Sequence, residues 1–340
     1  MSQSLVVQAR SLSFMLMSVG NHTQTKRRKF CYEERERILK ENTAFGMHHA
    51  KELRKWKHNT DVYEAINAGT KLHKLVYHGN QPLPVAVPNP VQPEVVKADC
   101  MDVLLRKQRD EHKHVIILNM CDAIQPMGEF VYENITQEQH LCLCSNLYVH
   151  LTEASKKKIN FYRVHVPDDA KQNAVRPRIV SMVNMEVYFF RDREYVMIQG
   201  GPRGPPVAVI SAAIPDMTRY FPVAQTEDLS GLVHTKQVKW RSTDVFPYNH
   251  ALIGHLLSTI EDVADRISND HAIDVQSVEV ILSAWGCGKG QHEPQTMAEM
   301  LKQHLQSKDR EKFPNVTFAI TGDPDTNYEI FRSVLHHERP

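Results

Sequence analysis

Two stretches of the sequence combine polar and glycine residues in arrangements that suit anion binding and acid–base chemistry. The first is Gln137-Glu138-Gln139, directly after Thr136. Thr136 is the predicted N-cap of a helix, and Gln139, three residues later, is its predicted partner in a capping box. Because a helix N-terminus presents backbone N–H groups, it suits an anion. The carboxyl group of Asp122, in the preceding loop, could bind a hydroxyl, exchange protons or simply cap that loop.

The second stretch is rich in glycine and follows another apolar run. Gly286, Gly288 and Gly290 alternate with other residues, and Lys289 adds a positive charge among them. Glycines let backbone N–H groups approach a phosphate without side chains in the way. The stretch therefore predicts a phosphate-contacting loop, with a plain glycine-rich turn as the alternative.

Apolar strands are expected to position both stretches. Val115–Leu118 precedes the first stretch and Val278–Ser283 precedes the second, and both have the β-branched composition of buried parallel strands. Val207–Ala213 is a third such run. Since these runs alternate with helical segments, we expect all three in one mixed sheet that is covered on both faces.

The remaining pattern predicts further elements. Pro-rich Gln81–Pro93 is expected to be a surface loop, because proline excludes it from a helix or a central strand. One helix is expected from Thr136 to about Thr152, and Met217–Thr243 is expected to be irregular. Other predicted elements include strands at Met185–Phe190, Tyr195–Ile198 and Val316–Ile320, and helices at Glu33–Glu41, Asp102–Lys107, Tyr248–Ile267, Pro294–Gln306 and Tyr328–His336.

Composition limits the class of protein. The 340 residues carry 41 basic and 40 acidic side chains, so no global field favours nucleic acid or an anionic membrane. No run reaches the roughly 18 apolar residues of a membrane helix. The six cysteines have no zinc-like spacing, which favours reduced thiols, and we expect neither a metal site nor a cofactor. We expect an intracellular protein, and the sequence does not decide between the nucleus, the cytoplasm and the mitochondrion.

The order of these blocks resembles the microbial-type poly(ADP-ribose) glycohydrolases, a branch of the macro-domain superfamily. Their signature is a Gly-Gly-Gly loop followed, six to eight residues later, by Gln-Glu-Glu at a helix start. Here Met127-Gly128-Glu129 stands at the loop, and seven residues separate it from Gln137-Glu138-Gln139. Ala284–Gly288 is similar to the family's second phosphate loop, and the resemblance covers roughly Glu34 to Phe331.

The resemblance implies the fold and its division. We expect a macro-domain-like three-layer α/β/α fold with a central mixed sheet and an N-terminal helical extension. Residues 1–32 lack acidic side chains and are expected to be a tail, either solvated or used for mitochondrial or nuclear targeting. Residues 33–97 are assigned to the helical extension and Pro-rich loop, and residues 98–340 to the glycohydrolase-type domain.

The resemblance also implies a ligand, either ADP-ribose or poly(ADP-ribose), including ADP-ribose attached to a protein. The family's acid is the last glutamate of Gln-Glu-Glu, where Gln139 stands. An amide cannot give up a proton near neutral pH, and loss of a general acid typically lowers a rate by about 10²–10⁴. Around the helix axis, the Glu138 side chain points about 100° away from that of Gln139, so Glu138 cannot simply replace the acid. Glu129 places a negative charge in the first loop. The implied ligand-binding residues are Asn119, Pro126, Gly128, Gln137, Gly286, Cys287, Gly288, Lys289 and Gly290.

Three functions remain open from the sequence. The first is an ADP-ribose-recognising domain that is inactive or impaired because of Gln139. The second is an active glycohydrolase that uses a replacement acid, for which Asp122, Glu129 and Glu138 are the candidates. The third is a scaffold that binds no nucleotide.

Overall fold

The computed structural model describes most of the chain from residue 34 onwards, within one compact unit. The described residues are 34–42, 70–74, 83–109, 113–122, 127, 135–156, 179–202, 204–214, 223–227, 233–237, 242–288, 290–321 and 326–336.

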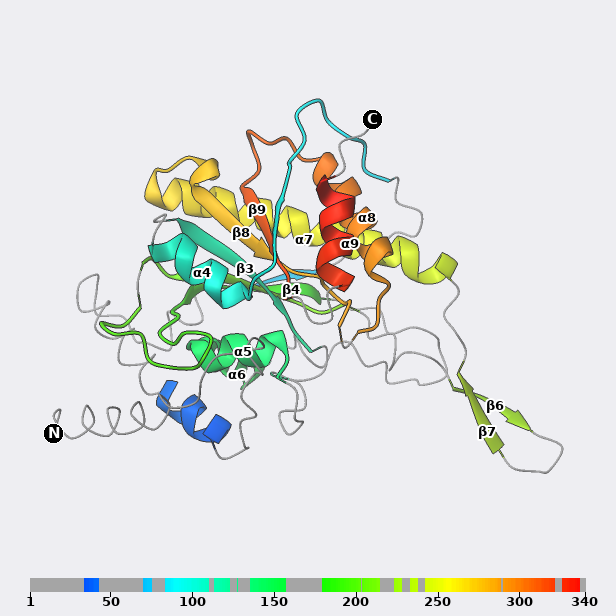
Figure 1. The fold of residues 1–340 in the computed structure, drawn as a ribbon, viewed down its shortest axis with the longest axis horizontal. Coiled ribbons are helices and arrows are strands. Elements are labelled where there is room, and N and C mark those ends of the chain that lie inside the picture. Colours follow the sequence, from blue (N-terminus) through cyan, green and yellow to red (C-terminus); the bar gives the residue numbers. More distant parts are fainter. Residues whose placement is uncertain are drawn as a thin grey trace, which may run out of the picture. The chain divides into compact units, whose positions relative to one another are not determined.

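A seven-stranded mixed sheet forms the centre of the fold, in the order β1-β4-β5-β3-β8-β9-β2 (Figure 1). Strands β5, β3, β8, β9 and β2 run parallel to one another, whereas β4 is antiparallel to both β1 and β5. The bounds are β1 Thr70–Lys74, β2 Glu94–Val96, β3 His114–Met120, β4 Ile179–Val187, β5 Val207–Ala212, β8 Val278–Leu282 and β9 Asn315–Ala319.

The three predicted apolar strands are adjacent in this sheet, which confirms that prediction. β3 lies between β5 and β8, with Ile117 opposite Val209 on one side and Ile281 on the other. Both faces of these strands are buried, so their sequences are continuous apolar runs. Because the strands are parallel, the loops after them meet at one edge of the sheet.

Helices cover both faces of the sheet. Ile116 and Leu118 of β3 pack in the same core as Leu252 and Leu256 of α7, whereas Lys107 of α4 reaches Glu279 on β8. The result is the expected three-layer α/β/α arrangement (Figure 1). The helices are α4 Cys100–Arg109, α5 Gln137–Cys144, α6 Leu147–Lys156, α7 Ser242–His271, α8 Pro294–Gln306 and α9 Thr326–His336, with a short 3₁₀ turn at Val275–Ser277 and a further helix at residues 34–42.

The single helix expected from Thr136 to about Thr152 is wrong, because the structure has two helices there. α5 ends at Cys144, and α6 begins at Leu147. Ser145 makes the break: its hydroxyl donates to Leu141 O at 2.7 Å and accepts from Leu147 N at 3.0 Å. A serine that bonds its local backbone offers an alternative to helical hydrogen bonds.

Other sequence expectations also change. Met217–Thr243 contains an antiparallel hairpin of β6 (Val223–Glu227) and β7 (Val233–Gln237), so it is not irregular throughout. The expected strand at Tyr195–Ile198 is absent, and that segment makes only one isolated bridge, between Arg191 and Met197.

The sheet extends into residues 33–97, which the sequence assigned to an N-terminal extension. β2 pairs in parallel with β9, and β1 pairs with β4. Between β1 and β2, residues 83–93 form neither helix nor named strand, as the prolines predict, and their backbone bonds to the end of α8 and the loop after it.

A buried ion pair fixes α4 to the central sheet. Lys107 Nζ lies 3.2 Å from Glu279 Oε2, and Thr317 Oγ1 donates to Glu279 Oε1 at 2.6 Å. The Glu279 side chain is only 3% exposed. A buried carboxylate that loses its partner is strongly unfavourable.

We therefore expect Lys107→Met to lower the free energy of unfolding by about 3–5 kcal/mol, because it leaves the Glu279 charge unpaired. Urea unfolding of the full chain measures this change. The double variant Lys107→Met, Glu279→Gln should recover part of the loss, because glutamine keeps a partner for Thr317 without the charge. Equal stability of the single variant and the wild type would contradict this role.

Candidate functional site

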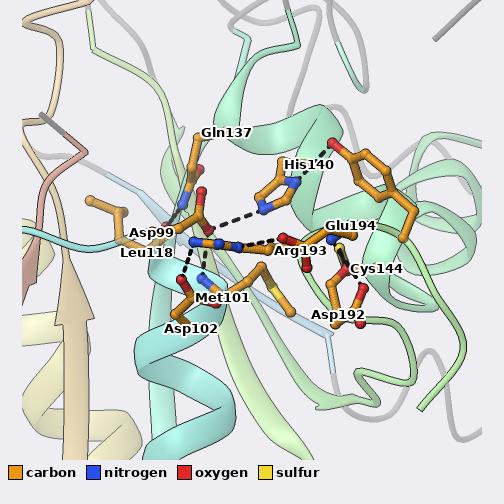
Figure 2. Close-up of polar contacts among 11 residues, drawn as sticks. Asp99, Met101, Asp102, Leu118, Gln137, His140, Cys144, Asp192, Arg193 and Glu194 are labelled. Atoms are coloured by element: carbon orange, nitrogen blue, oxygen red, sulfur yellow. Dashed lines mark hydrogen bonds and ion pairs between the residues drawn. The ribbon is translucent and has the colours of Figure 1, made fainter. Parts of the chain in front are cut away.

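The start of α5 is held against the end of β3 by the side chain of Gln137. Its Nε2 donates to Leu118 O at 2.7 Å, and its Oε1 accepts from Met120 N at 2.9 Å. Figure 2 shows the Gln137 side chain directed at Leu118. Gln137 thus satisfies backbone groups of β3 beyond the last residue that pairs with β8, and it sets the distance between strand and helix.

Thr136 and Gln139 form the capping box that the sequence predicts. Thr136 Oγ1 accepts from Gln139 N at 3.3 Å, and Gln139 Oε1 accepts from Thr136 N at 3.2 Å. The other end of the amide, Gln139 Nε2, donates to Met127 O at 2.9 Å. Both ends of this buried side chain therefore bond to backbone.

Met127 has a left-handed backbone, with φ 63°, at a position where the family that the sequence resembles has glycine. Left-handed backbone is unfavourable for a non-glycine residue by about 1–2 kcal/mol. The Met127 side chain is 2% exposed, so its burial offsets this penalty.

Glu138 lies inside the protein, with an exposed fraction of 1%. Its Oε2 accepts from Asp122 N at 3.0 Å, and its Oε1 is 3.5 Å from Asn119 Nδ2. Asn119 Nδ2 also donates to Ser211 Oγ at 3.0 Å, which links β3 to β5. Among the described residues, Asn119 Oδ1 has no hydrogen-bond partner although it is buried. A buried acceptor of this kind suits a donor group on a ligand.

The second loop, which contains Gly286, Gly288 and Gly290, is a tight turn that requires two of these glycines. Gly286 has φ 81°, and a Cβ there would lie 2.7 Å from the ring of His292. A Cβ on Gly290 would lie 2.9 Å from Gly286 O. In contrast, a Cβ on Gly288 would meet no atom of the described residues within 4 Å. Gly286 and Gly290 thus shape the loop, and Gly288 lies next to open space.

The loop closes on itself and leaves donors free. His292 N donates to Gly286 O at 3.0 Å, and Gln291 N donates to Gly288 O at 3.0 Å. Within the described part of the chain, the N–H groups of Gly286, Gly288 and Gly290 donate to no protein acceptor. Free backbone donors grouped in one turn suit an anion.

The thiols near both loops are inert. Burial raises the pKa of the Cys121 thiol well above its ordinary value, and the neighbouring Glu138 carboxylate raises it further. Burial, with a smaller contribution from the Glu293 carboxylate, raises the pKa of Cys287 to about 12. Because the thiolate is the nucleophile, neither cysteine supplies one near neutral pH.

A second polar cluster supports α5 from the side. His140 Nε2 lies 3.1 Å from Asp99 Oδ1, and His140 Nδ1 lies 2.9 Å from Tyr195 Oη. Asp99 also accepts from Met101 N at the start of α4 (Figure 2). Sequence reasoning missed this cluster because Asp99 and Tyr195 are 41 and 55 residues away from His140 along the chain.

The structure brings five of the predicted residues together at one junction. They are Asn119, Asp122, Gln137, Glu138 and Gln139. Gly286, Cys287, Gly288 and Gly290 follow β8, the neighbour of β3, at the same edge of the sheet. Pro126, Gly128, Glu129 and Lys289 lie outside the described residues. The sequence missed Ser211, His292 and Asn249, whose Nδ2 is 3.3 Å from His292 Nδ1.

Comparison with known families gives a match over the first part of the chain. The sequence model of the microbial-type PARG catalytic domain, where PARG is poly(ADP-ribose) glycohydrolase, matches residues 18–192. This is just over half of the 340-residue chain. The matched segment contains β3, the first loop and α5. No curated protein matches the chain.

Solved structures with a similar fold are poly(ADP-ribose) glycohydrolases. One, from Deinococcus radiodurans in complex with ADP-ribose, has 20% identity and a TM-score of 0.57, over 82% of this chain and 99% of that one. Another, from Thermomonospora curvata, has 17% identity and a TM-score of 0.57, over 89% and 99%. The Thermomonospora curvata protein bound to the inhibitor ADP-HPD has 17% identity and a TM-score of 0.56, over 88% and 99%. These likenesses show the fold.

Two features are absent from the described residues. No helix in that part of the chain has both the length and the apolar character of a membrane span. In the same residues, no three histidine, cysteine or acidic side chains converge in a way that could hold a metal ion.

Proposed function

The chain belongs to the microbial-type poly(ADP-ribose) glycohydrolases, and from that premise we propose that it recognises ADP-ribose but hydrolyses its glycosidic bond slowly or not at all. The ligand is ADP-ribose, free or within poly(ADP-ribose), or attached to a protein. The solved relatives from Deinococcus radiodurans and Thermomonospora curvata hold ADP-ribose or the inhibitor ADP-HPD, which supports this ligand class.

One observation carries the proposed loss of activity: the bonding of Gln139. Glycosidic hydrolysis passes through an oxocarbenium-like state, and a carboxylic acid protonates the leaving oxygen. In this chain the position has an amide whose Oε1 is bonded to Thr136 N and whose Nε2 is bonded to Met127 O. Gln139 therefore serves the structure of the loop and helix, and it has no proton to give.

Recognition rests on groups that the chain retains. The grouped N–H donors of Gly286, Gly288 and Gly290 suit a diphosphate, which carries two negative charges. The N-terminus of α5 adds a positive partial charge near the end of β3. Asn119 Oδ1 supplies a buried acceptor for a hydroxyl or amino group of the ligand.

An active glycohydrolase is the second candidate, because two carboxyl groups remain at the same junction. Glu138 Oε2 and the backbone of Asp122 are joined by a hydrogen bond of 3.0 Å. A replacement acid must reach the leaving oxygen, whereas Glu138 is almost fully buried. Asp122 is partly exposed and is the better placed of the two.

Calorimetry with ADP-ribose, together with an assay of ADP-ribose release from poly(ADP-ribose), tests the proposal. We expect saturable binding and little or no release. Binding with robust release would identify an active enzyme, and the absence of binding would favour a scaffold. Asp122→Asn tests the replacement acid, because only loss of a true acid removes pH-dependent turnover.

A further inference from the structure

The C-terminal end of α5 is buried and fully bonded by groups from outside the helix. A helix leaves its last four carbonyl groups without intrahelical partners. Leu141 O accepts from Ser145 Oγ at 2.7 Å, and Cys144 O accepts from Phe190 N and Arg191 N at 3.1 Å each. The two carbonyls between them are bonded by Asn42.

Asn42 comes from the helix at residues 34–42, about a hundred residues earlier in the chain. Its Nδ2 donates to Leu143 O at 2.8 Å and lies 3.3 Å from both Cys142 O and Ser145 O. The Asn42 side chain is 2% exposed. It therefore caps α5 from a distant segment of sequence.

Arg191 holds the other end of the Asn42 amide. Its Nε donates to Asn42 Oδ1 at 2.7 Å, its Nη1 to Tyr195 O at 2.8 Å and its Nη2 to Glu41 Oε2 at 2.8 Å. α5 has no basic residue in its own last turn. The Arg191 guanidinium supplies the positive charge that a helix C-terminus favours.

The length of α5 makes these outside bonds important. Eight residues span about 12 Å, and a helix this short is unstable by itself in water. Gln137 fixes the first turn to β3, and Asn42 fixes the last turn. The orientation of α5, which sets the positions of Glu138 and Gln139, thus depends on both ends.

We propose that Asn42 is a positioning residue for the ADP-ribose site, and that it acts by fixing the C-terminal end of α5. The proposal rests on the proposed function, since it assumes that ADP-ribose binds at the opposite end of this helix. It gives residues 34–42 a role in ligand recognition, although that segment lies far along the chain from both loops.

The variant Asn42→Asp separates the two halves of this contact. Aspartate keeps an acceptor for Arg191 but replaces the donor that bonds the α5 carbonyls, so the cap is lost while the ion pairing of helix 34–42 remains. We expect ADP-ribose affinity to fall about tenfold in calorimetry. We also expect the backbone amides of α5 to exchange hydrogen at least about tenfold faster, with no change in β8.

Two further variants give the controls. Asn42→Ala removes the cap without adding charge, and it serves if Asn42→Asp does not fold. Asn315→Ala removes a comparable bond, Asn315 Nδ2 to Gln276 O at 2.8 Å, at the amino end of β9. It should lower thermal stability without changing affinity or α5 exchange.

The outcomes separate this proposal from the proposed function. Wild-type affinity and unchanged α5 exchange in folded Asn42 variants would overturn the role of Asn42. If the wild type itself bound no ADP-ribose, the proposed function would fail. The exchange of α5 amides would then still decide whether Asn42 fixes this helix, because it needs no ligand.

Discussion

Replacing Gly288 with aspartate is expected to weaken ADP-ribose binding about a hundredfold or more while leaving the fold intact. A Cβ at this position meets no atom within 4 Å, so the side chain fits. The carboxylate would stand beside the N–H groups that we assign to the diphosphate. At about 5 Å and an effective dielectric near 20, two like charges repel by about 3 kcal/mol, which corresponds to more than a hundredfold in affinity.

Calorimetry with ADP-ribose measures this effect, and Gly288→Asn isolates its cause. Asparagine has nearly the same size as aspartate without the charge, so it should weaken binding far less. Gly290→Ala is unsuitable as a control, because its Cβ would lie 2.9 Å from Gly286 O and distort the loop. If Gly288→Asp bound ADP-ribose as tightly as the wild type, this loop would not contact the phosphates.

The central fold was predictable because its signals are local. The apolar runs at β3, β5 and β8 identify buried strands, and Thr136 with Gln139 identifies the start of α5. The break between α5 and α6 was not predictable, because Ser145 is tolerated within helices, and only its extended backbone and its bond from Leu147 N show the break. β2 has three residues, and its place in the sheet depends on a partner more than 200 residues away.

The candidate site was predictable in its residue types but not in its geometry. The resemblance predicts that Gln139 stands in place of the family's acid, but its bond to Met127 O, a residue with a left-handed backbone, was not predictable from residue types. Likewise, the sequence did not separate the glycines by role, although Gly286 and Gly290 shape the loop and Gly288 does not. Contacts such as that of Asn42 with Leu143 join distant segments, so no short motif contains them.

Stability of a Gln139→Glu variant is expected to fall as pH rises. Glutamate keeps the acceptor for Thr136 N, but its other oxygen would face Met127 O, which now accepts from Nε2 at 2.9 Å. Only a protonated carboxyl can donate there, so the folded state raises the pKa of the new carboxyl above its unfolded value. The folded state then binds more protons, and stability present at low pH is lost as pH rises through that pKa. Thermal unfolding across pH measures this.

Gln139→Glu is also expected to produce release of ADP-ribose from poly(ADP-ribose) where the wild type shows little. A carboxyl with a raised pKa is a suitable general acid near neutral pH, and a general acid contributes about 10²–10⁴ to a rate. The gain in turnover should be partial, since Met127 keeps its side chain in the first loop. Gln137→Glu is the matched control. It introduces the same charge two residues before position 139, where the new carboxylate would face Leu118 O. This variant should lose stability without gaining turnover. Robust turnover by the wild type would contradict this account. Asp122→Asn, Glu129→Gln and Glu138→Gln would then identify the acid, because only one of them should abolish the pH-dependent rate.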